Sequence, residues 1–346
     1  MSRRVLVTGG GGVVGGAVVS ALLDRGDEVR SFSRGDHPHL RARGVEVLRG
    51  DLVDLAAVER AVHGCDAVIH AAAKTDFSLD PRPFVATNVV GTANVIAACR
   101  RRGVPRLVHT STPGVVYDGR SITGGDESLP YATHPDAPYP ATKARAEQLV
   151  LAANGDGLAT VALRPHLVWG PGDTQLTAEI LRRARAGRLR LIDGGAAVVD
   201  ATFIDDAAAA HVLALDALDG PTVAGRRPVA GRPLFIGSDH PLPIATMVNG
   251  ILSAAGLPQE HRSVPFGVAY ALGAACEAAW RATRRSDPPP VTRHLARQQA
   301  TSHWFDLTAA RRDLGYRPAV RPEEGFTRLA TALRAAATGE HDHAVG

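Results

Sequence analysis

Short apolar runs alternate with helical patterns through the first half of the chain. Val5–Thr8 is a largely apolar run of strand length, and in Val13–Arg25 the residues Val14, Val18 and Leu22 share one helical face. The same patterns predict further strands at Glu28–Phe32, Val45–Leu48, Ala67–His70, Arg106–Ser111 and Thr160–Leu163. They predict further helices at Ala56–Val62, Val85–Arg101 and Ala141–Ala153. Strands that alternate with helices are typical of βαβ units, so we expect an α/β fold with a doubly wound parallel sheet of six strands.

The rhythm of the pattern changes in the second half. Proline and glycine interrupt it at Gly170–Asp173, Gly187–Gly195 and Asp219–Gly231, and the helical stretches between these points are shorter. We therefore expect a nucleotide-binding domain over residues 1–168 and a smaller, interleaved substrate domain over residues 169–202 and 219–338. Residues 203–218 are expected to return to the first domain, and residues 339–346 to form a frayed polar tail.

The composition is that of an ordinary globular protein, with 45% hydrophobic and 21% charged residues among 346. The formal charge of +4 is small for this length and the arginines are scattered, so neither nucleic acid nor a membrane surface is an expected partner. Three cysteines at unrelated spacings, and an N-terminus that runs directly into the first strand, favour a cytoplasmic location. The fourteen histidines are scattered too, so metal catalysis is not expected.

One segment, Val264–Trp280, is apolar enough to raise the question of a membrane. It contains Glu277 and is shorter than the roughly 20 apolar residues that span a bilayer. We expect a helix packed over a lipophilic pocket, and a helix lying at a membrane interface is the alternative.

A glycine-rich loop joins the first strand to the first helix. Gly9, Gly12 and Gly15 match G-x-x-G-x-x-G, and the neighbouring Gly10 also allows G-x-G-x-x-G. Glycine permits the tight turn and lets a pyrophosphate approach the backbone at the helix N-terminus. We expect the loop and the first helical residues, Val13 and Val14, to bind a dinucleotide cofactor.

The end of the second strand bears on the choice of cofactor. An NAD site usually has Asp or Glu there, whereas this strand ends in Ser33 and Arg34. A hydroxyl beside a guanidinium suits a 2′-phosphate, so NADP(H) is preferred and NAD(H) remains possible. The alternative is that Arg34 is simply a solvated loop residue. Asp51 and Leu52, after the third strand, are placed either to contact the adenine or to form a plain turn.

Tyr139 and Lys143 are the candidate proton-transfer pair. They lie four residues apart at a helix start and therefore share one face. A free phenol has a pKa of about 10, and a nearby ammonium lowers it toward the range useful in catalysis. Of the 39 basic side chains only Lys74 and Lys143 are lysines, which favours a specific need for these amines.

Hydroxyl side chains follow the fifth strand, where ligands bind in parallel sheets. Thr112 is the candidate to hold a substrate carbonyl oxygen, with Ser111 beside it. The alternative role for these hydroxyls is to cap a turn.

Together these residues resemble the extended short-chain dehydrogenase/reductases, and within them the 3β-hydroxysteroid dehydrogenase-like branch. The matching motifs run through nearly the whole chain: the glycine loop, Gly50-Asp-Leu52, His70-Ala-Ala-Ala73, Asn88-Val-Val-Gly-Thr92, His109-Thr-Ser-Thr112, Tyr139 to Lys143, Arg164-Pro165, Phe203-Ile-Asp-Asp206, Trp304-Phe-Asp306 and Leu314-Gly-Tyr-Arg-Pro318. The resemblance implies a Rossmann fold and an NAD(P)-dependent oxidoreductase.

The resemblance also implies roles for single residues. Ala71, Ala72 and Ala73 would line the nicotinamide ribose, Asn88 would brace the fourth-strand region, and Thr112 would be the catalytic hydroxyl. Arg164 and Pro165 would lead into backbone that meets the nicotinamide, and His166 stands where the family often has Asn. Members pair two long helices across a two-fold axis, which implies a homodimer through Val85–Arg101 and Ala141–Ala153.

Four strings, SFSRGDHPHL, HTSTPGVV, ALRPHLVWGPGDTQL and SHWFDLTAARRDLGY, are similar to those of 2-alkyl-3-oxoalkanoate reductases. This implies an NADPH-dependent ketoreductase that acts on a lipophilic 3-oxo acid or a related β-keto compound. The alternatives are a sterol 3β-dehydrogenase, or a nucleotide-sugar epimerase or dehydratase in which Arg182, Arg183 and Arg185 bind a diphosphate. A non-enzymatic redox sensor is disfavoured by Tyr139 and Lys143.

Lys74 follows the fourth strand, where the crevice beside the nicotinamide should open. Its ammonium is a candidate to bind the carboxylate of a 3-oxo acid. A solvated lysine paired with Asp76 is the alternative. His166 is a second candidate for contact with the substrate.

Overall fold

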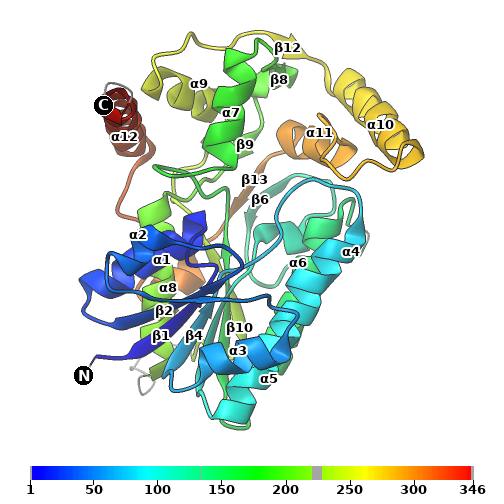
Figure 1. Ribbon diagram of the computed structural model, residues 1–346. Helices are drawn as coiled ribbons and strands as arrows, with labels where there is room; N and C mark the ends of the chain where they lie inside the picture. The colour runs from blue at the N-terminus through cyan, green and yellow to red at the C-terminus, as the bar shows by residue number, and fades with distance from the viewer. Residues whose placement is uncertain (1, 134, 220–227, 344–346) are drawn as a thin grey trace.

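The computed structural model describes residues 2–133, 135–219 and 228–343 (Figure 1). Its main feature is a seven-stranded sheet in the order β10-β7-β5-β4-β1-β2-β3, in which every neighbouring pair is parallel. The strands are β1 (Arg4–Thr8), β2 (Glu28–Ser33), β3 (Glu46–Arg49), β4 (Ala67–His70), β5 (Arg106–Thr110), β7 (Ala159–Pro165) and β10 (Arg232–Ile236).

Helices cover both faces of this sheet. The helices α1 (Val13–Asp24) and α8 (Ile204–Asp219) pack side by side on one face, and α3 (Leu55–Val62), α5 (Gly91–Arg102) and α6 (Pro138–Ala152) cover the other (Figure 1). The alternation along β1 explains the two layers, because Val5 and Val7 join the core under α1 and α8 while Leu6 joins the core under α3 and α5. The doubly wound α/β fold is therefore confirmed.

One strand and one helix differ from the prediction. A seventh strand, β10, lies at the sheet edge beside β7, within the range 219–338 that was assigned to the substrate domain. This five-residue run follows a segment rich in proline and glycine, so its sequence alone resembles a loop. The predicted long helix Val85–Arg101 is also interrupted, since a π-helical turn, η1 (Val85–Val90), precedes α5.

The strand order reverses between β1 and β4. Crossovers leave this point in opposite directions, so the carboxyl ends of the two strands open into a crevice. In such sheets the crevice at the reversal is the usual ligand site, and the glycine loop, Ala71–Ala73 and the end of β5 all lie along this edge.

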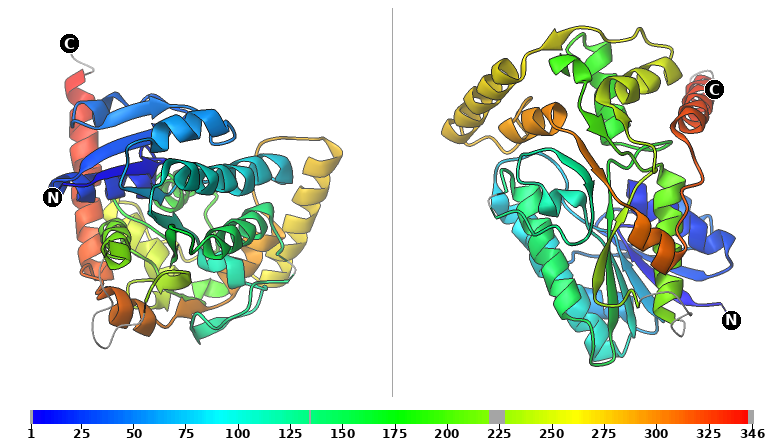
Figure 2. Two further views of the ribbon diagram at one scale, coloured as in Figure 1. Left: turned by 90° about the horizontal axis from the view of Figure 1, so that it is seen from below. Right: turned by 180° about the vertical axis from the view of Figure 1, so that it is seen from behind.

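The second half of the chain, together with the strand β6 (Ile122–Gly125) from the first half, builds a smaller layer beyond the carboxyl edge of the sheet (Figure 2). It contains a four-stranded sheet, β11-β9-β13-β6, a two-stranded sheet, β12-β8, and a core of its own around Trp169, Phe203 and Ile251. The strands are β6 (Ile122–Gly125), β8 (Leu191–Ile192), β9 (Val198–Val199), β11 (Leu242–Pro243), β12 (Ser263–Val264) and β13 (His303–Phe305). The helices of this half other than α8 are α7 (Leu176–Arg185), α9 (Ile244–Ala254), α10 (Phe266–Ala282), α11 (Arg293–Ala300) and α12 (Pro322–His343). The remaining short elements are α2 (Pro38–Arg41), α4 (Pro81–Phe84), η2 (Pro113–Val116), η3 (Asp193–Gly195) and η4 (Ala310–Leu314).

Most of the apolar segment Val264–Trp280 lies in α10, which begins at Phe266 after strand β12 has ended at Val264. This helix packs on α11, and its buried residues form one narrow stripe of Ala269, Gly273 and Glu277. Among the described helices none has the length and apolar character to cross a membrane. Residues 339–346 were expected to form a frayed tail, but α12 continues as a helix to His343. Residues 344–346 lie outside the described part of the chain.

Candidate active site

The glycine loop is built so that its glycines cannot be replaced without displacing backbone. Gly9 has a φ of +73°, and a Cβ there would lie 2.9 Å from the Cα of Ala72. A Cβ on Gly15 would lie 2.2 Å from the carbonyl oxygen of Gly9. Gly12 precedes α1, whose first turn has neither a side-chain cap nor an acidic residue. The loop therefore presents free N–H groups at a positive helix end, and Val13 and Val14 begin the helix there.

The end of β2 combines three side chains with hydrogen-bonding groups. The Nε2 atom of His37 lies 2.9 Å from the Oγ atom of Ser33, and the His37 ring lies directly over Gly11, 2.0 Å from where a Cβ would be. Arg34 is exposed beside them. Asp51 accepts a hydrogen bond from the backbone of Val53, so this carboxylate closes a turn after β3. The neighbouring Leu52 is buried against the core under α3.

The loop after β4 is fixed from two sides. The backbone N–H of Ala72 donates to Oγ1 of Thr8, and Ala71 and Ala73 are half-buried beside it. Asn88 exchanges hydrogen bonds with the backbone of Lys74 and also donates to Oγ1 of Thr142 in α6. Asn88 thus ties the β4 loop to the helix that carries Tyr139.

Thr112 and Tyr139 are brought together across the crevice. Tyr139 lies in the first turn of α6, where Pro138 and Pro140 suit a helix start. Burial raises the pKa of Tyr139 to about 12, and a hydrogen bond from Thr112 acts in the opposite direction. Thr112 also accepts a hydrogen bond from the backbone of Gly114, so its hydroxyl is held in place. The Oγ atom of Ser111 is buried beside it and has no partner among the described residues.

Lys143 is buried one helical turn beyond Tyr139, but its amine faces β5. It donates to the carbonyl oxygen of Thr110 at 2.6 Å and lies 3.1 Å from Nε2 of His109. Burial lowers the pKa of Lys143 to about 7, although Glu147 acts in the opposite direction. The lowering of the Tyr139 pKa by Lys143 stays a prediction: in this structure burial has the largest effect on the pKa of Tyr139, and the amine of Lys143 is bonded to β5.

Arg164 and His166 are committed to the protein itself. The guanidinium of Arg164 forms a fully buried ion pair with Glu147, with Nη2 and Oε1 2.6 Å apart. His166 uses both ring nitrogens, since Nδ1 lies 2.7 Å from the carbonyl oxygen of Asp200 and Nε2 lies 3.0 Å from Nδ1 of His303. Contacts from this segment to a ligand would therefore come from the backbone after Pro165. The expectation that the His166 side chain binds substrate is not supported by its bonding.

A small cavity adjoins Tyr139. Its volume is about 20 Å³, and its lining includes Tyr139 together with Asp76, Phe77, Asp136, Glu277 and His294. Lys74 lies at its margin, where its ammonium is paired with Asp76 and lies 5.0 Å from the ring centre of Phe84. The pairing with Asp76 is the alternative that the sequence left open, and it leaves this ammonium with a partner already.

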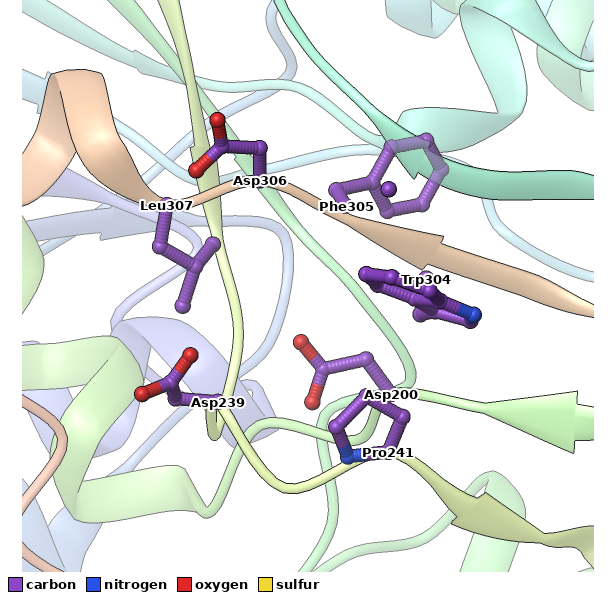
Figure 3. A pocket seen from close by; sticks show the side chains of 8 residues that line it. Asp200, Asp239, Pro241, Trp304, Phe305, Asp306 and Leu307 are labelled. Carbon is purple, nitrogen blue, oxygen red and sulfur yellow. The ribbon is translucent and has the colours of Figure 1, made fainter.

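A larger hollow of about 310 Å³ is lined in part by Trp304 and Phe305 of β13 (Figure 3). Three aspartates, Asp200, Asp239 and Asp306, surround it together with Trp304 and Leu307. None of the residues predicted to be catalytic lines it, and three carboxylates make it a poor site for an anionic cofactor. The smaller cavity is the one that matches the predicted chemistry.

Three histidines that the sequence did not assign to the site lie beside residues predicted to form it: His37 beside Ser33, His109 beside Lys143, and His294 in the cavity wall with Tyr139. His37 lies only four residues beyond Ser33, and His109 begins the motif that contains Thr112. Their positions near the ends of predicted strands could have indicated both histidines as site residues. His294 comes from α11, and its position relative to Tyr139 follows only from the packing of the second half.

The fold and this site define the class of protein: an NAD(P)-dependent oxidoreductase of the extended short-chain dehydrogenase/reductase type, with a nicotinamide cofactor. The chain belongs to the 3-beta hydroxysteroid dehydrogenase/isomerase family, which matches residues 6–266.

Relatives of known name cover almost the whole chain. It is 48% identical to the 2-alkyl-3-oxoalkanoate reductase of Stenotrophomonas maltophilia, over 94% of this chain and 98% of that protein. It is 42% identical to the enzyme of the same name from Shewanella oneidensis, over 95% and 86%. The UDP-glucuronic acid 4-epimerase of Bacillus cereus in complex with NAD superimposes with a TM-score of 0.73 at 20% identity, over 96% and 99%, which shows the shared fold.

Proposed function

We propose that this protein is an NADPH-dependent ketoreductase that converts the ketone of a lipophilic 3-oxo acid, of the 2-alkyl-3-oxoalkanoate class, to the secondary alcohol. The observation that carries the proposal is the hydrogen-bonded pair of Thr112 and Tyr139 beside the small cavity. The similarity of the chain to two 2-alkyl-3-oxoalkanoate reductases supports the choice of substrate class.

The residues present fit a nicotinamide dinucleotide. Gly9 and Gly15 form a tight loop that a Cβ at either position would disrupt, the N-terminus of α1 is uncapped, and the buried Oγ of Ser111 lacks a protein partner in the described chain. Gly9, Gly12 and Gly15 would hold the pyrophosphate, with the β4 loop at the nicotinamide ribose. When bound, the nicotinamide supplies the hydride that adds to the ketone carbon.

A preference for NADPH is supported by the end of β2. Ser33, Arg34 and His37 place a hydroxyl, a guanidinium and an imidazole together, and no carboxylate occupies this strand end. All three groups can donate hydrogen bonds to a phosphate, whereas a carboxylate there would repel it.

The protein side chains supply the proton and hold the ketone. Tyr139 stays protonated at neutral pH because burial raises its pKa to about 12, so it is in the state needed to donate a proton to the developing alkoxide. Thr112 hydrogen bonds the same oxygen and fixes its position. Lys143, protonated in part near pH 7, holds positive charge close to the end of β5.

The second candidate function is oxidation of a 3β-hydroxysteroid, which the description of the family favours. Tyr139 would then remove the hydroxyl proton while Thr112 holds the hydroxyl oxygen. That reaction needs Tyr139 as a phenolate, whereas its raised pKa keeps the phenol protonated at neutral pH, which is the state that a reduction needs.

The test is a set of rates for the purified chain with NADPH and with NADH against 2-alkyl-3-oxo acids, 3-ketosteroids and UDP-sugars. The expected result is rapid NADPH oxidation with the 3-oxo acids alone. The cavity is smaller than a long alkyl chain, so substrate binding should displace α10 and α11, which cover it, and should alter their hydrogen exchange. Preferential turnover of steroids or nucleotide sugars would contradict the proposal.

Two further features belong to the same proposal. We propose a homodimer, supported by Val90 and Leu149, which are 43% and 39% exposed on η1 and α6. A cytoplasmic location is supported by three free thiols, Cys65, Cys99 and Cys276.

A further inference from the structure

His294 is a nearly buried histidine in the wall of the catalytic cavity. It is the second residue of α11, it is 5% exposed, and it lines the same cavity as Tyr139. Its Nδ1 atom is fully buried and has no hydrogen-bond partner in the described part of the chain. A buried polar atom without a hydrogen bond costs free energy. A ligand that forms a hydrogen bond with this ring would therefore recover that free energy on binding.

The carboxylates around this histidine are compensated by cations, so an anionic ligand would not meet unpaired negative charge. Three carboxylates line the cavity, and each is already paired with a cation, one of them with two. The described pairs therefore hold one positive charge in excess. They are Lys74 with Asp76, Arg297 with Asp136, and Arg293 and Arg281 with Glu277.

The other polar groups of the cavity wall are already in use. The hydroxyl of Ser78 donates to Asp76, and Thr292 caps α11 by accepting from the backbone of Leu295. Burial lowers the pKa of His294 to about 4, so the ring is neutral at neutral pH and carries one N–H. A neutral imidazole can donate that N–H without bringing a buried charge of its own.

We propose that His294 donates a hydrogen bond to the carboxylate of the 3-oxo acid whose ketone oxygen lies at Tyr139 and Thr112, and so selects acids over neutral ketones. This inference rests on the proposed ketoreductase function. It accounts for an unpartnered imidazole that lines the same cavity as Tyr139, where each lining carboxylate is already paired with a cation.

The experiment compares two substrates that differ only in the acid group, a 2-alkyl-3-oxo acid and its methyl ester, with native enzyme, His294→Phe and His294→Gln. Phenylalanine keeps a ring for the edge contact with Tyr117, 6.1 Å away between ring centres, and removes the N–H. Glutamine keeps a donor. For His294→Phe we expect KM for the acid to rise tenfold or more, about the loss of one hydrogen bond to a charged group, with little change in kcat or in KM for the ester. His294→Gln should recover most of the loss.

Each other outcome has one meaning. If KM rises equally for acid and ester, His294 only shapes the cavity, and if neither rises it takes no part in recognition. If His294→Gln fails as badly as His294→Phe while melting temperatures and NADPH affinity match the native enzyme, the donor is not what matters. Failure of the proposed function is seen separately, because native enzyme would then reduce neither the acid nor the ester.

Discussion

The amine nitrogen of Lys143 lies 3.1 Å from Nε2 of His109, and neither side chain reaches solvent. When Lys143 is protonated its ammonium only donates, so Nε2 accepts and the histidine proton lies on Nδ1, which has no partner among the described residues. Burial and the charge of Lys143 both lower the pKa of His109 well below its usual value, so the ring is neutral as this geometry needs. We therefore predict that His109 positions the amine of Lys143.

Replacing His109 by Phe should remove one of the two hydrogen bonds that orient the Lys143 amine. We expect kcat to fall about tenfold, the effect of losing one hydrogen bond to a charged group, and the pH–rate profile to shift with the pKa of the amine. His109→Gln retains an acceptor and is the matched control. A His109→Phe enzyme with the native pH profile would show that the contact does not orient the amine.

Tyr139→Phe should lose about two or more powers of ten in kcat while it still binds NADPH, because only the proton donor is removed. Thr112→Val should lower turnover less, since it removes a hydrogen bond to the oxygen but leaves the donor. Turnover under saturating NADPH and cofactor fluorescence titration separate the two effects. Near-native turnover of Tyr139→Phe would refute the assignment.

Much of the nucleotide half was predictable because its signals are local. Strand and helix periods, the glycine loop and the Tyr139–Lys143 spacing each occupy one short segment, and the structure places them on one sheet edge. The cavity wall was not predictable, since Asp136, Glu277 and His294 meet only through the packing of α6, α10 and α11. The pKa of Lys143 was missed for a related reason, as desolvation depends on the whole surrounding fold.

Lys143→Met should stabilise the unliganded protein in a pH-dependent way. The pKa of Lys143 is about 7 in the folded chain and about 10.4 in an unfolded one, so the folded state binds fewer protons between these values. The penalty of burying this amine is therefore full below pH 7 and disappears as the pH rises toward the unfolded pKa. Differential scanning calorimetry should show the variant melting higher than the native chain at pH 6, with a gap that narrows by pH 9. A gap that does not depend on pH would contradict this account.

Arg34→Ala and His37→Phe should each weaken NADPH binding by about tenfold or more and leave NADH binding nearly unchanged, because only NADPH has a 2′-phosphate. Arg60→Ala removes one exposed arginine on α3 and controls for the loss of general charge. Isothermal titration with both cofactors measures the difference. Equal losses of affinity for NADPH and NADH in the variants, or tighter binding of NADH than of NADPH by the native chain, would contradict the preference for NADP.

The dimer prediction now depends on few residues. In the sequence both helices have apolar residues on more than one face. Most of these residues are buried within one chain, namely Val89, Val95, Ile96 and Val150. Only Val90 and Leu149 among them are clearly exposed. If a two-fold axis pairs these helices, Val90→Glu with Leu149→Glu places like charges against each other in a desolvated contact. Light scattering at micromolar concentration should give a dimer for the native chain and a monomer for the double variant. Val268→Glu, on the exposed face of α10, is the control and should leave the mass unchanged. A monomeric native chain, or a double variant that stays dimeric, would move the interface away from these helices.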